Sequence, residues 1–297
     1  MRLADPAPVE QEIRRLLAGN EADLVCWVDA VWGLGYLSPA PAHMATALMV
    51  HVPRTDAPLY RGLEHRPGRV LTISDFMVEE LAREGVGTAD WAVVPNALMH
   101  TITPPTSDER EALRERGPLR IVVRAEPHKG IAELLKAYPA GLGRPLQIVL
   151  AEAGFEYWPG MQNEVVTECR ALAAALPDVE ILPALPWQKV PSFLAGAAAT
   201  VISSTSPETF GNVAAEALSV GTPVIGYGLG HLPALTGPAG RMTALESGPE
   251  ALWEALTTLL GDQAAYHAAS AHGPRQVAAH TPAAVAQAFL PATGMIR

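Results

Sequence analysis

The sequence predicts an α/β protein built on parallel sheets, and three observations support this prediction. From residue 120 to residue 260, short runs rich in β-branched and apolar residues alternate with amphipathic stretches. Gly, Pro and Asp residues separate these segments. The first hundred residues repeat the alternation more weakly. Because apolar strands that alternate with helices form parallel sheets covered on both faces, each half is predicted to be a Rossmann-like domain.

The second half is predicted to hold five strands with helices between them. The strands are expected at residues 120–125, 146–151, 179–182, 200–204 and 222–227. The intervening segments KGIAELLKAY, NEVVTECRALAAAL, QKVPSFLAGA and NVAAEALSV have apolar residues near i, i+3 and i+4, which indicates helices that bury one side.

The first half is predicted to hold one early helix and four strands. The helix is expected at residues 9–17 and the strands at residues 23–28, 47–52, 69–73 and 91–94. Ser74 and Asp75 are typical helix-starting residues and predict a helix over FMVEELAREG. The Pro-rich, charged stretch TPPTSDEREALRERGP has little to bury and predicts a linker. We therefore expect domains at 1–105 and 119–275, a linker at 106–118 and a terminal helix within 276–297.

The composition excludes several classes of protein. The chain has 297 residues, a net charge of −10, 49% hydrophobic and 18% charged residues, which is typical of a globular protein. An acidic chain is poorly suited to binding nucleic acid, so an anionic ligand must be bound by a local cluster of positive charge. Neither a signal peptide nor an apolar run of about 18 residues is present, so we expect a cytoplasmic protein without a membrane span. Cys26 and Cys169 are expected to be free thiols.

Two cationic residues follow the first strand of the second half. In open parallel sheets, ligands bind at the carboxyl ends of the strands. Arg124 ends the strand and Lys129 opens the next helix. A guanidinium and an ammonium beside the free N–H groups of a helix start suit a diphosphate. Alone, such a pair is more often two solvated loop cations, so this prediction depends on a second segment.

That second segment follows the strand at residues 200–204. Glu208 lies in the strand-to-helix loop, and Gly211 and Asn212 open the helix with N–H groups that can approach an anion. Glu216 is the only charged residue in NVAAEALSV. A carboxylate among small, apolar side chains needs hydrogen-bond donors, and a ribose diol supplies two; the alternative is a solvent-facing residue. With no D-x-D element in the sequence, we expect no metal.

These segments resemble the retaining GT-B glycosyltransferases of family four. The arrangement of Glu208 and Glu216, followed by EALSVGTPVIGYGLGHLPAL, is similar to the donor-binding segment of that family. VVRAEPHKG resembles its strand-end Arg and helix-start Lys, and RVLTISDFMVEELAREGVGTADWAVVPNAL resembles the end of its N-terminal domain. The resemblance covers roughly residues 23–260. It implies a GT-B fold, with two Rossmann-like domains facing a cleft and a shortened N-terminal one.

The resemblance also implies an activity and a set of site residues. The implied enzyme is of the hexosyltransferase type (EC class 2.4). It would move a sugar from a nucleotide-diphosphate sugar to an acceptor hydroxyl with retention of configuration, using neither a metal nor another cofactor. Arg124 and Lys129 would hold the diphosphate and Glu216 the ribose. The sugar would contact Glu208 and the backbone of Phe210, Gly211 and Asn212. The implied catalytic residues are Glu208 and His51, which ends a strand in ALMVHVPRTD; a merely packed or hydrogen-bonded His51 is the alternative.

Departures from the family pattern leave other functions open. Val123 and Ala97 stand where the family usually has Gly, and only about a hundred residues precede the linker. One alternative is therefore a nonenzymatic subunit that binds a nucleotide-sugar and needs a partner chain. Others are a GT-B sugar epimerase and, least favoured, a solute-binding protein. A second copy of the chain could complete the acceptor side in a homo-oligomer. The base, the sugar and the acceptor are not specified by the sequence.

Overall fold

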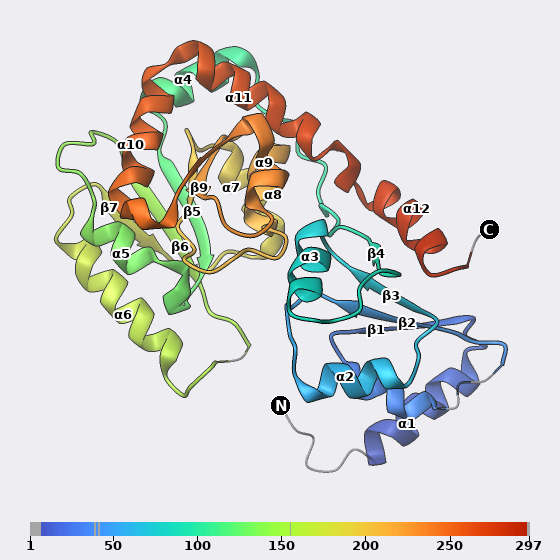
Figure 1. The fold of residues 1–297 in the computed structure, drawn as a ribbon. Helices are drawn as coiled ribbons and strands as arrows, with labels where there is room; N and C mark the ends of the chain where they lie inside the picture. Colours follow the sequence, from blue (N-terminus) through green and yellow to red (C-terminus); the bar gives the residue numbers. More distant parts are fainter. Residues whose placement is uncertain (1–6, 39, 41, 155, 296–297) are drawn as a thin grey trace. The chain divides into compact units, whose positions relative to one another are not determined.

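The computed structural model describes residues 7–38, 40, 42–154 and 156–295, and the chain forms two compact units (Figure 1). The N-terminal unit combines Met1–Ala97 with Pro282–Arg297, and the C-terminal unit is the continuous stretch Leu98–Thr281. Each unit contains parallel strands connected through helices. The predicted α/β class with two Rossmann-like units is thereby confirmed.

The N-terminal unit is built on a four-stranded parallel sheet in the order β1-β2-β3-β4. Its strands are β1 (Leu24–Val28), β2 (Ala45–Val50), β3 (Arg69–Thr72) and β4 (Ala92–Val93). Its helices are α1 (Ala7–Gly19), η1 (Val31–Leu37), α2 (Ala57–Glu64), α3 (Asp75–Arg83) and α12 (Pro282–Ala292). The predicted strands are present, although β2 ends at Val50 because the next backbone N–H, that of His51, donates to the Asp29 side chain.

The last helix of the chain completes the N-terminal unit. Apolar residues of α12, among them Val285 and Phe289, pack against buried Ala47, Leu71 and Val94 of the sheet. Figure 1 shows α12 beside β3 and β4. The helix predicted near the C-terminus is therefore present, and it covers a sheet whose strands come from the first hundred residues.

The C-terminal unit contains two three-stranded parallel sheets that adjoin. One has the order β5-β6-β7 and the other β10-β9-β8. The strands are β5 (Leu119–Arg124), β6 (Leu146–Ala151), β7 (Val179–Leu182), β8 (Thr200–Ile202), β9 (Val224–Tyr227) and β10 (Gly240–Thr243). A parallel bridge between Leu119 and Ala199 joins β5 to the start of β8. The chain leaves β5 toward β6 and returns to β8 on the other side, which makes the β5–β8 boundary a topological switch point.

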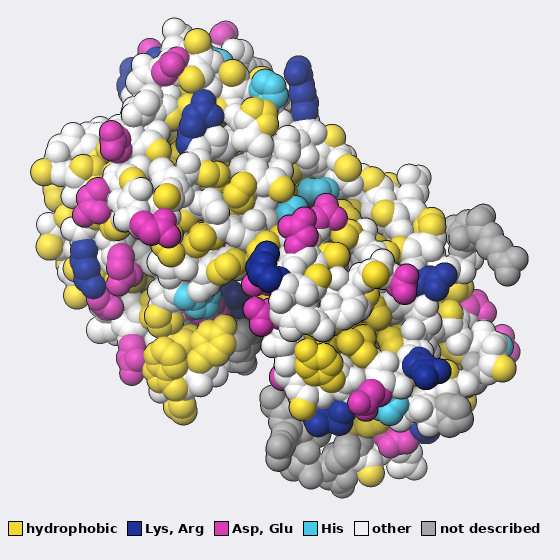
Figure 2. All heavy atoms as spheres, viewed as in Figure 1, with side chains coloured by type: hydrophobic (Ala, Val, Ile, Leu, Met, Phe, Trp, Pro, Cys, Tyr) yellow, Lys and Arg dark blue, Asp and Glu magenta, His cyan; other side chains and the backbone are white. Residues whose placement is uncertain are grey.

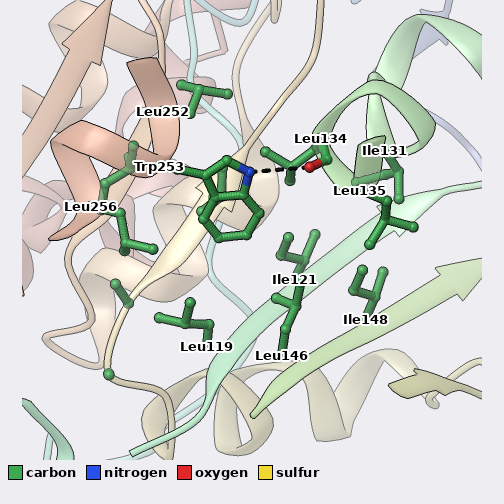
Figure 3. Packing of buried hydrophobic residues seen from close by; sticks show 14 of the residues in the cluster. Leu119, Ile121, Ile131, Leu134, Leu135, Leu146, Ile148, Leu252, Trp253 and Leu256 are labelled. Atoms are coloured by element: carbon green, nitrogen blue, oxygen red, sulfur yellow. Dashed lines mark hydrogen bonds between the residues drawn. The ribbon is translucent and has the colours of Figure 1, made fainter. Parts of the chain in front are cut away.

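Helices cover these strands and enclose an apolar core. They are α5 (Ile131–Lys136), α6 (Met161–Ala174), α7 (Val190–Ala195), α8 (Asn212–Ser219), α9 (Leu232–Thr236), α10 (Gly248–Gly261) and α11 (Gln263–Gln276). Leu119, Ile121, Leu146 and Ile148 project from β5 and β6 into this core (Figure 3). The indole Nε1 of Trp253 donates to a backbone carbonyl of α5 at 3.1 Å, so the one polar atom of this large side chain is satisfied.

The stretch predicted as a linker holds helix α4 (Ser107–Arg116). Thr106 and Glu109 form a capping box at its start. Arg110 is buried, and its guanidinium donates to Thr222 Oγ1 and to the backbone carbonyls of Ala195, Ala197 and Val220. We expected this stretch to bury little. Instead, the charged side chain of Arg110 is buried and attaches α4 to the rest of the C-terminal unit.

The surface carries charges of both signs. On the face shown in Figure 2, basic and acidic side chains are interspersed with hydrophobic ones. Both cysteines are free, as predicted, and burial raises the pKa of the Cys169 thiol to about 11. In the part of the chain that the structure describes, every helix is too short or too polar to cross a membrane.

Candidate functional site

The loops that follow β5 and β8 are bound to each other at the switch point. After β5 the chain forms a short 3-10 turn, η2 (Pro127–Lys129), and then Gly130 with a φ of 68°. A Cβ atom at Gly130 would lie 2.3 Å from the Ser203 carbonyl oxygen, so only glycine allows this approach. Ser203 Oγ donates to the Lys129 carbonyl at 2.7 Å, and Thr205 N donates to the His128 carbonyl at 2.8 Å. The two loops therefore form one local structure.

An ion pair between Lys129 and Glu208 connects these loops. Lys129 Nζ lies 2.5 Å from Glu208 Oε1, and Ser204 Oγ donates to the same oxygen at 2.6 Å. Their side chains are only 12% and 19% exposed, so water screens the pair weakly. Burial favours a higher pKa for Glu208, but the charge of Lys129, hydrogen bonds from Lys129 and Ser204, and the charge of Arg124 together lower it. The structure thus brings three of the predicted residues together, namely Lys129, Glu208 and Arg124.

The glycine-rich turn after β9 holds the backbone of Glu208. Gly230 pairs with Glu208 in a parallel bridge, and His231 N donates to the Glu208 carbonyl at 2.8 Å. Gly230 has a φ of 63°, and a Cβ atom there would lie 2.4 Å from the Glu208 carbonyl oxygen. The ring of Phe210 is buried and stacks on the His231 imidazole at 5.9 Å. Glu208 is therefore fixed at its backbone as well as at its carboxylate.

Helix α8 begins directly after this loop. Gly211 is its N-cap residue, with a φ of 93°, and contributes no capping side chain. Its first backbone N–H groups come from Asn212 onward and carry the partial positive charge of a helix start. Asn212 is exposed, whereas Gly211 is buried. The predicted glycine and asparagine thus occupy the expected positions at the start of the helix.

Glu216 lies further along α8, outside the ion-pair cluster. It is partly buried between Ala215 and Ala217, which are fully buried, as its apolar helix predicts. Burial raises the pKa of its carboxyl group to about 7, and no neighbouring charge contributes to this shift. Glu216 therefore lacks a cationic partner among the described residues, and hydrogen-bond donors of a ligand would suit it.

Replacing Glu216 with Gln is expected to stabilise the protein in a pH-dependent manner. Because the folded-state pKa is about 7, above the ordinary 4.5, the folded protein binds more protons, and its stability falls as pH rises through that interval. Urea unfolding should show a gain for the Glu216→Gln variant of up to about 3 kcal/mol at pH 8 and under about 1 kcal/mol at pH 5. The exposed Glu254→Gln variant is the control. An equal gain in stability at both pH values would contradict the inference that burial raises the pKa of Glu216.

His51 belongs to the N-terminal unit, where it follows β2. Asp29, which follows β1, accepts a hydrogen bond from the His51 backbone N–H at 2.7 Å through Oδ1. Asp29 Oδ2 lies 3.2 Å from His51 Nδ1. Burial tends to raise the pKa of Asp29, but the His51 contacts and the charge of Arg54 lower it. The backbone of His51 is therefore fixed by a carboxylate at the end of the sheet, and its Nδ1 atom is buried beside the same carboxylate without a hydrogen bond to it.

The sequence interpretation did not single out Glu126 or His128, although both lie in VVRAEPHKG. The Glu126 side chain is completely buried. Its Oε1 lies 3.1 Å from Arg124 Nη1, and its Oε2 lies 3.1 Å from His128 Nε2. The sequence did offer one signal for Glu126: it lies just after a predicted strand and two residues from the cationic Arg124. Its complete burial is visible only in the structure.

Two Rossmann-like units with a charged site at strand ends are the architecture of GT-B glycosyltransferases, and solved structures of that class share this fold. The sucrose-phosphate synthase of Thermosynechococcus elongatus has a TM-score of 0.78 at 19% identity, over 95% of this chain and 75% of that one. HepE of Anabaena, in complex with UDP and glucose, has a TM-score of 0.76 at 17% identity, over 97% of this chain and 82% of that one. The trehalose-phosphate synthase (UDP-forming) of Burkholderia vietnamiensis has a TM-score of 0.73 at 12% identity, over 97% and 78%.

The sequence itself assigns the family. Residues 107–276, more than half of the chain, match the model of the glycosyl transferases group 1 family, and the chain belongs to that family. The predicted GT-B fold and the transferase class are therefore confirmed. A comparison with curated proteins finds no match.

Proposed function

We propose that this protein transfers a sugar from a nucleotide-diphosphate sugar to an acceptor hydroxyl with retention of configuration and without a metal, as a family-four enzyme. One observation carries the proposal: Lys129 and Glu208 form a shielded ion pair across the loops of β5 and β8, at the switch point. Ligands of open parallel sheets bind at such points. Among the fold neighbours, HepE has been solved with UDP and glucose, which supports a nucleotide-diphosphate donor.

The residues present can stabilise a departing diphosphate. Arg124 ends β5 and is exposed, and Lys129 lies five residues further on. Charge-assisted hydrogen bonds from these groups, with N–H groups at the start of α8, would neutralise the charge that develops on the leaving group. Lys129 is paired with Glu208, so donor binding would redirect its ammonium group toward the phosphate. Two cations in place are the reason to propose a metal-independent reaction.

The two predicted glutamates would serve the sugar and the ribose. As the glycosidic bond breaks, positive charge grows on the sugar ring, and the Glu208 carboxylate, kept ionised by its neighbours, would stabilise it. Glu216, a partly buried carboxylate without a charged partner, would accept hydrogen bonds from the ribose hydroxyls. His51, held by Asp29, would act from the N-terminal unit on the sugar or the acceptor. We assign no protein nucleophile.

A nucleotide panel tests this function directly. Thermal unfolding in the presence of UDP, GDP, ADP and TDP should show a clear rise in Tm with one of them, because a ligand at a hundred times its Kd stabilises by about 2.7 kcal/mol. The matching nucleotide-sugar should then be hydrolysed slowly, and added EDTA should change neither result. A nucleotide that binds without any donor turnover would favour a nonenzymatic binding subunit. Failure of all four nucleotides to bind would contradict the proposal.

A further inference from the structure

Glu126 is a buried charge that the proposed function does not use. Its side chain has no solvent exposure, and its contacts with Arg124 Nη1 and His128 Nε2, at 3.1 Å each, lack good hydrogen-bond geometry. A carboxylate removed from water is costly unless cations compensate for it. Arg124 supplies one such cation. The second neighbour, His128, can supply another only when its ring is protonated.

His128 lies among the charges of the donor site. The charged groups that act on it are Glu126, Arg124, Lys129 and Glu208. The ring of Tyr157, from the loop after β6, meets the imidazole edge-on at a centroid distance of 6.1 Å. Burial first, and the charge of Lys129 next, lower the pKa of His128, while Glu126 and Glu208 act in the opposite direction. The ring is therefore mostly neutral near pH 7.

The charge balance of this cluster depends on that ring. When His128 is neutral, Arg124 and Lys129 are matched by Glu126 and Glu208, and the cluster has no net charge. When His128 is protonated, the cluster has a net positive charge. The buried Glu126 carboxylate then contacts two cations, the imidazolium and the guanidinium of Arg124. A diphosphate placed against this cluster favours the protonated ring, because an anion stabilises a nearby cation.

We propose that His128 is a further donor-binding residue, which takes up a proton when the diphosphate binds, and that Glu126 is the positioning residue that holds its imidazole for this role. The inference rests on the proposed function, because it requires an anionic donor at the switch point. The proton comes from solvent and stays on the imidazole while the donor is bound. Donor affinity consequently rises as pH falls.

Calorimetry measures this proton uptake. The probe is UDP-glucose, or the nucleotide-sugar that matches the nucleotide bound in the panel; a sugar-substituted diphosphate does not titrate between pH 6 and 8. Titrations at pH 7 in PIPES and in imidazole, buffers with different ionisation heats, should show uptake of a fraction of a proton. Between pH 8 and pH 6 the affinity of the protein for the donor should increase about fivefold, because a shift of one unit in the pKa of a single group gives the full tenfold only at a pH well below both pKa values.

Two variants and a control identify the group that takes up the proton. These measurements are made in the Glu216→Gln background, because Glu216 has a pKa of about 7 and would release a proton on accepting hydrogen bonds from the ribose. In that background, His128→Asn should abolish the proton uptake and the pH dependence of donor affinity. Glu126→Gln should also abolish the proton uptake, because the imidazolium loses its carboxylate, and it should bind the donor more tightly at pH 8, because the cluster loses a negative charge. His272→Asn, which alters an exposed histidine of α11, should keep the proton uptake and the pH dependence. A cooperative thermal unfolding transition shows that the variants are folded; if Glu126→Gln does not fold, His128→Asn decides.

The outcomes separate this inference from the proposed function. Binding without proton uptake, or uptake that persists in His128→Asn, would overturn the role of His128 and leave the donor site intact. Absence of nucleotide-sugar binding at every pH would overturn the proposed function and this inference together.

Discussion

Replacing both Arg124 and Lys129 with Ala is expected to weaken nucleotide-sugar binding by at least about a hundredfold, because each charged hydrogen-bond donor contributes about 1.5–3 kcal/mol. The loss of Lys129 has a second effect: the Glu208 carboxylate, which the ammonium group contacts at 2.5 Å, would be left facing an anion. Isothermal titration of the unmodified protein and the double variant at one salt concentration measures the loss.

The control for this variant must change the net charge equally. Arg116→Ala with Arg170→Ala removes two exposed arginines from α4 and α6 of the same unit. This control should bind the donor within about twofold of the unmodified protein, because exposed charges away from the site contribute little. An unchanged affinity in the Arg124/Lys129 variant would remove the diphosphate assignment.

The Glu208→Gln variant is expected to lower kcat about a hundredfold, with donor affinity changed far less. Gln keeps the size of the side chain and can still accept from Ser204 Oγ, but it removes the negative charge that would face the developing positive charge on the sugar. Because the acceptor is unknown, kcat is measured as the rate at which water hydrolyses the donor. Isothermal titration with the donor measures the affinity separately.

Two comparisons sharpen this second prediction. Glu180→Gln alters an exposed carboxylate on β7 and should leave kcat unchanged. Ser204→Ala removes one hydrogen bond to Glu208 and should lower kcat by a smaller factor than Glu208→Gln. If Glu208→Gln turns over donor at the rate of the unmodified protein, its carboxylate takes no part in the reaction.

The sequence predicted β5 to β9 of the C-terminal unit because parallel strands buried on both faces are continuous apolar runs. Ile121 and Ile148, for example, lie in the core of the unit, and their strands begin within one residue of the expected positions. It did not predict β10, whose residues GRMT are mostly half-buried. Helix α4 was not predicted, although Thr106 and Glu109 form a capping box that is visible in the sequence. The burial of Arg110 could not be predicted, because the groups that accept its hydrogen bonds lie about eighty or more residues further along the chain. Pairings of this kind leave no periodic signal in the sequence.

The residues of the candidate site could also be predicted in part from the sequence. Positions at strand ends and helix starts, a single charge within an apolar helix and a resemblance to a family together selected Arg124, Lys129, Glu208 and Glu216. The structure brings Lys129 and Glu208 into contact, with Arg124 near them. The contact itself was not predicted, because a sequence does not show which loops adjoin. Glu126 was missed because a glutamate shortly after a strand is usually a solvated loop residue, and its complete burial is visible only in the structure.

Helix α12 has a consequence for the order in which the protein assembles during synthesis. The segment Leu98–Thr281 is continuous, so it can acquire its structure as soon as it has left the ribosome. The sheet that begins at Leu24 must instead wait, with the apolar surface around Leu71 and Val94 uncovered, until Val285 and Phe289 have been added. The portion translated first is therefore the portion finished last, and in the interval it is the natural client for a chaperone.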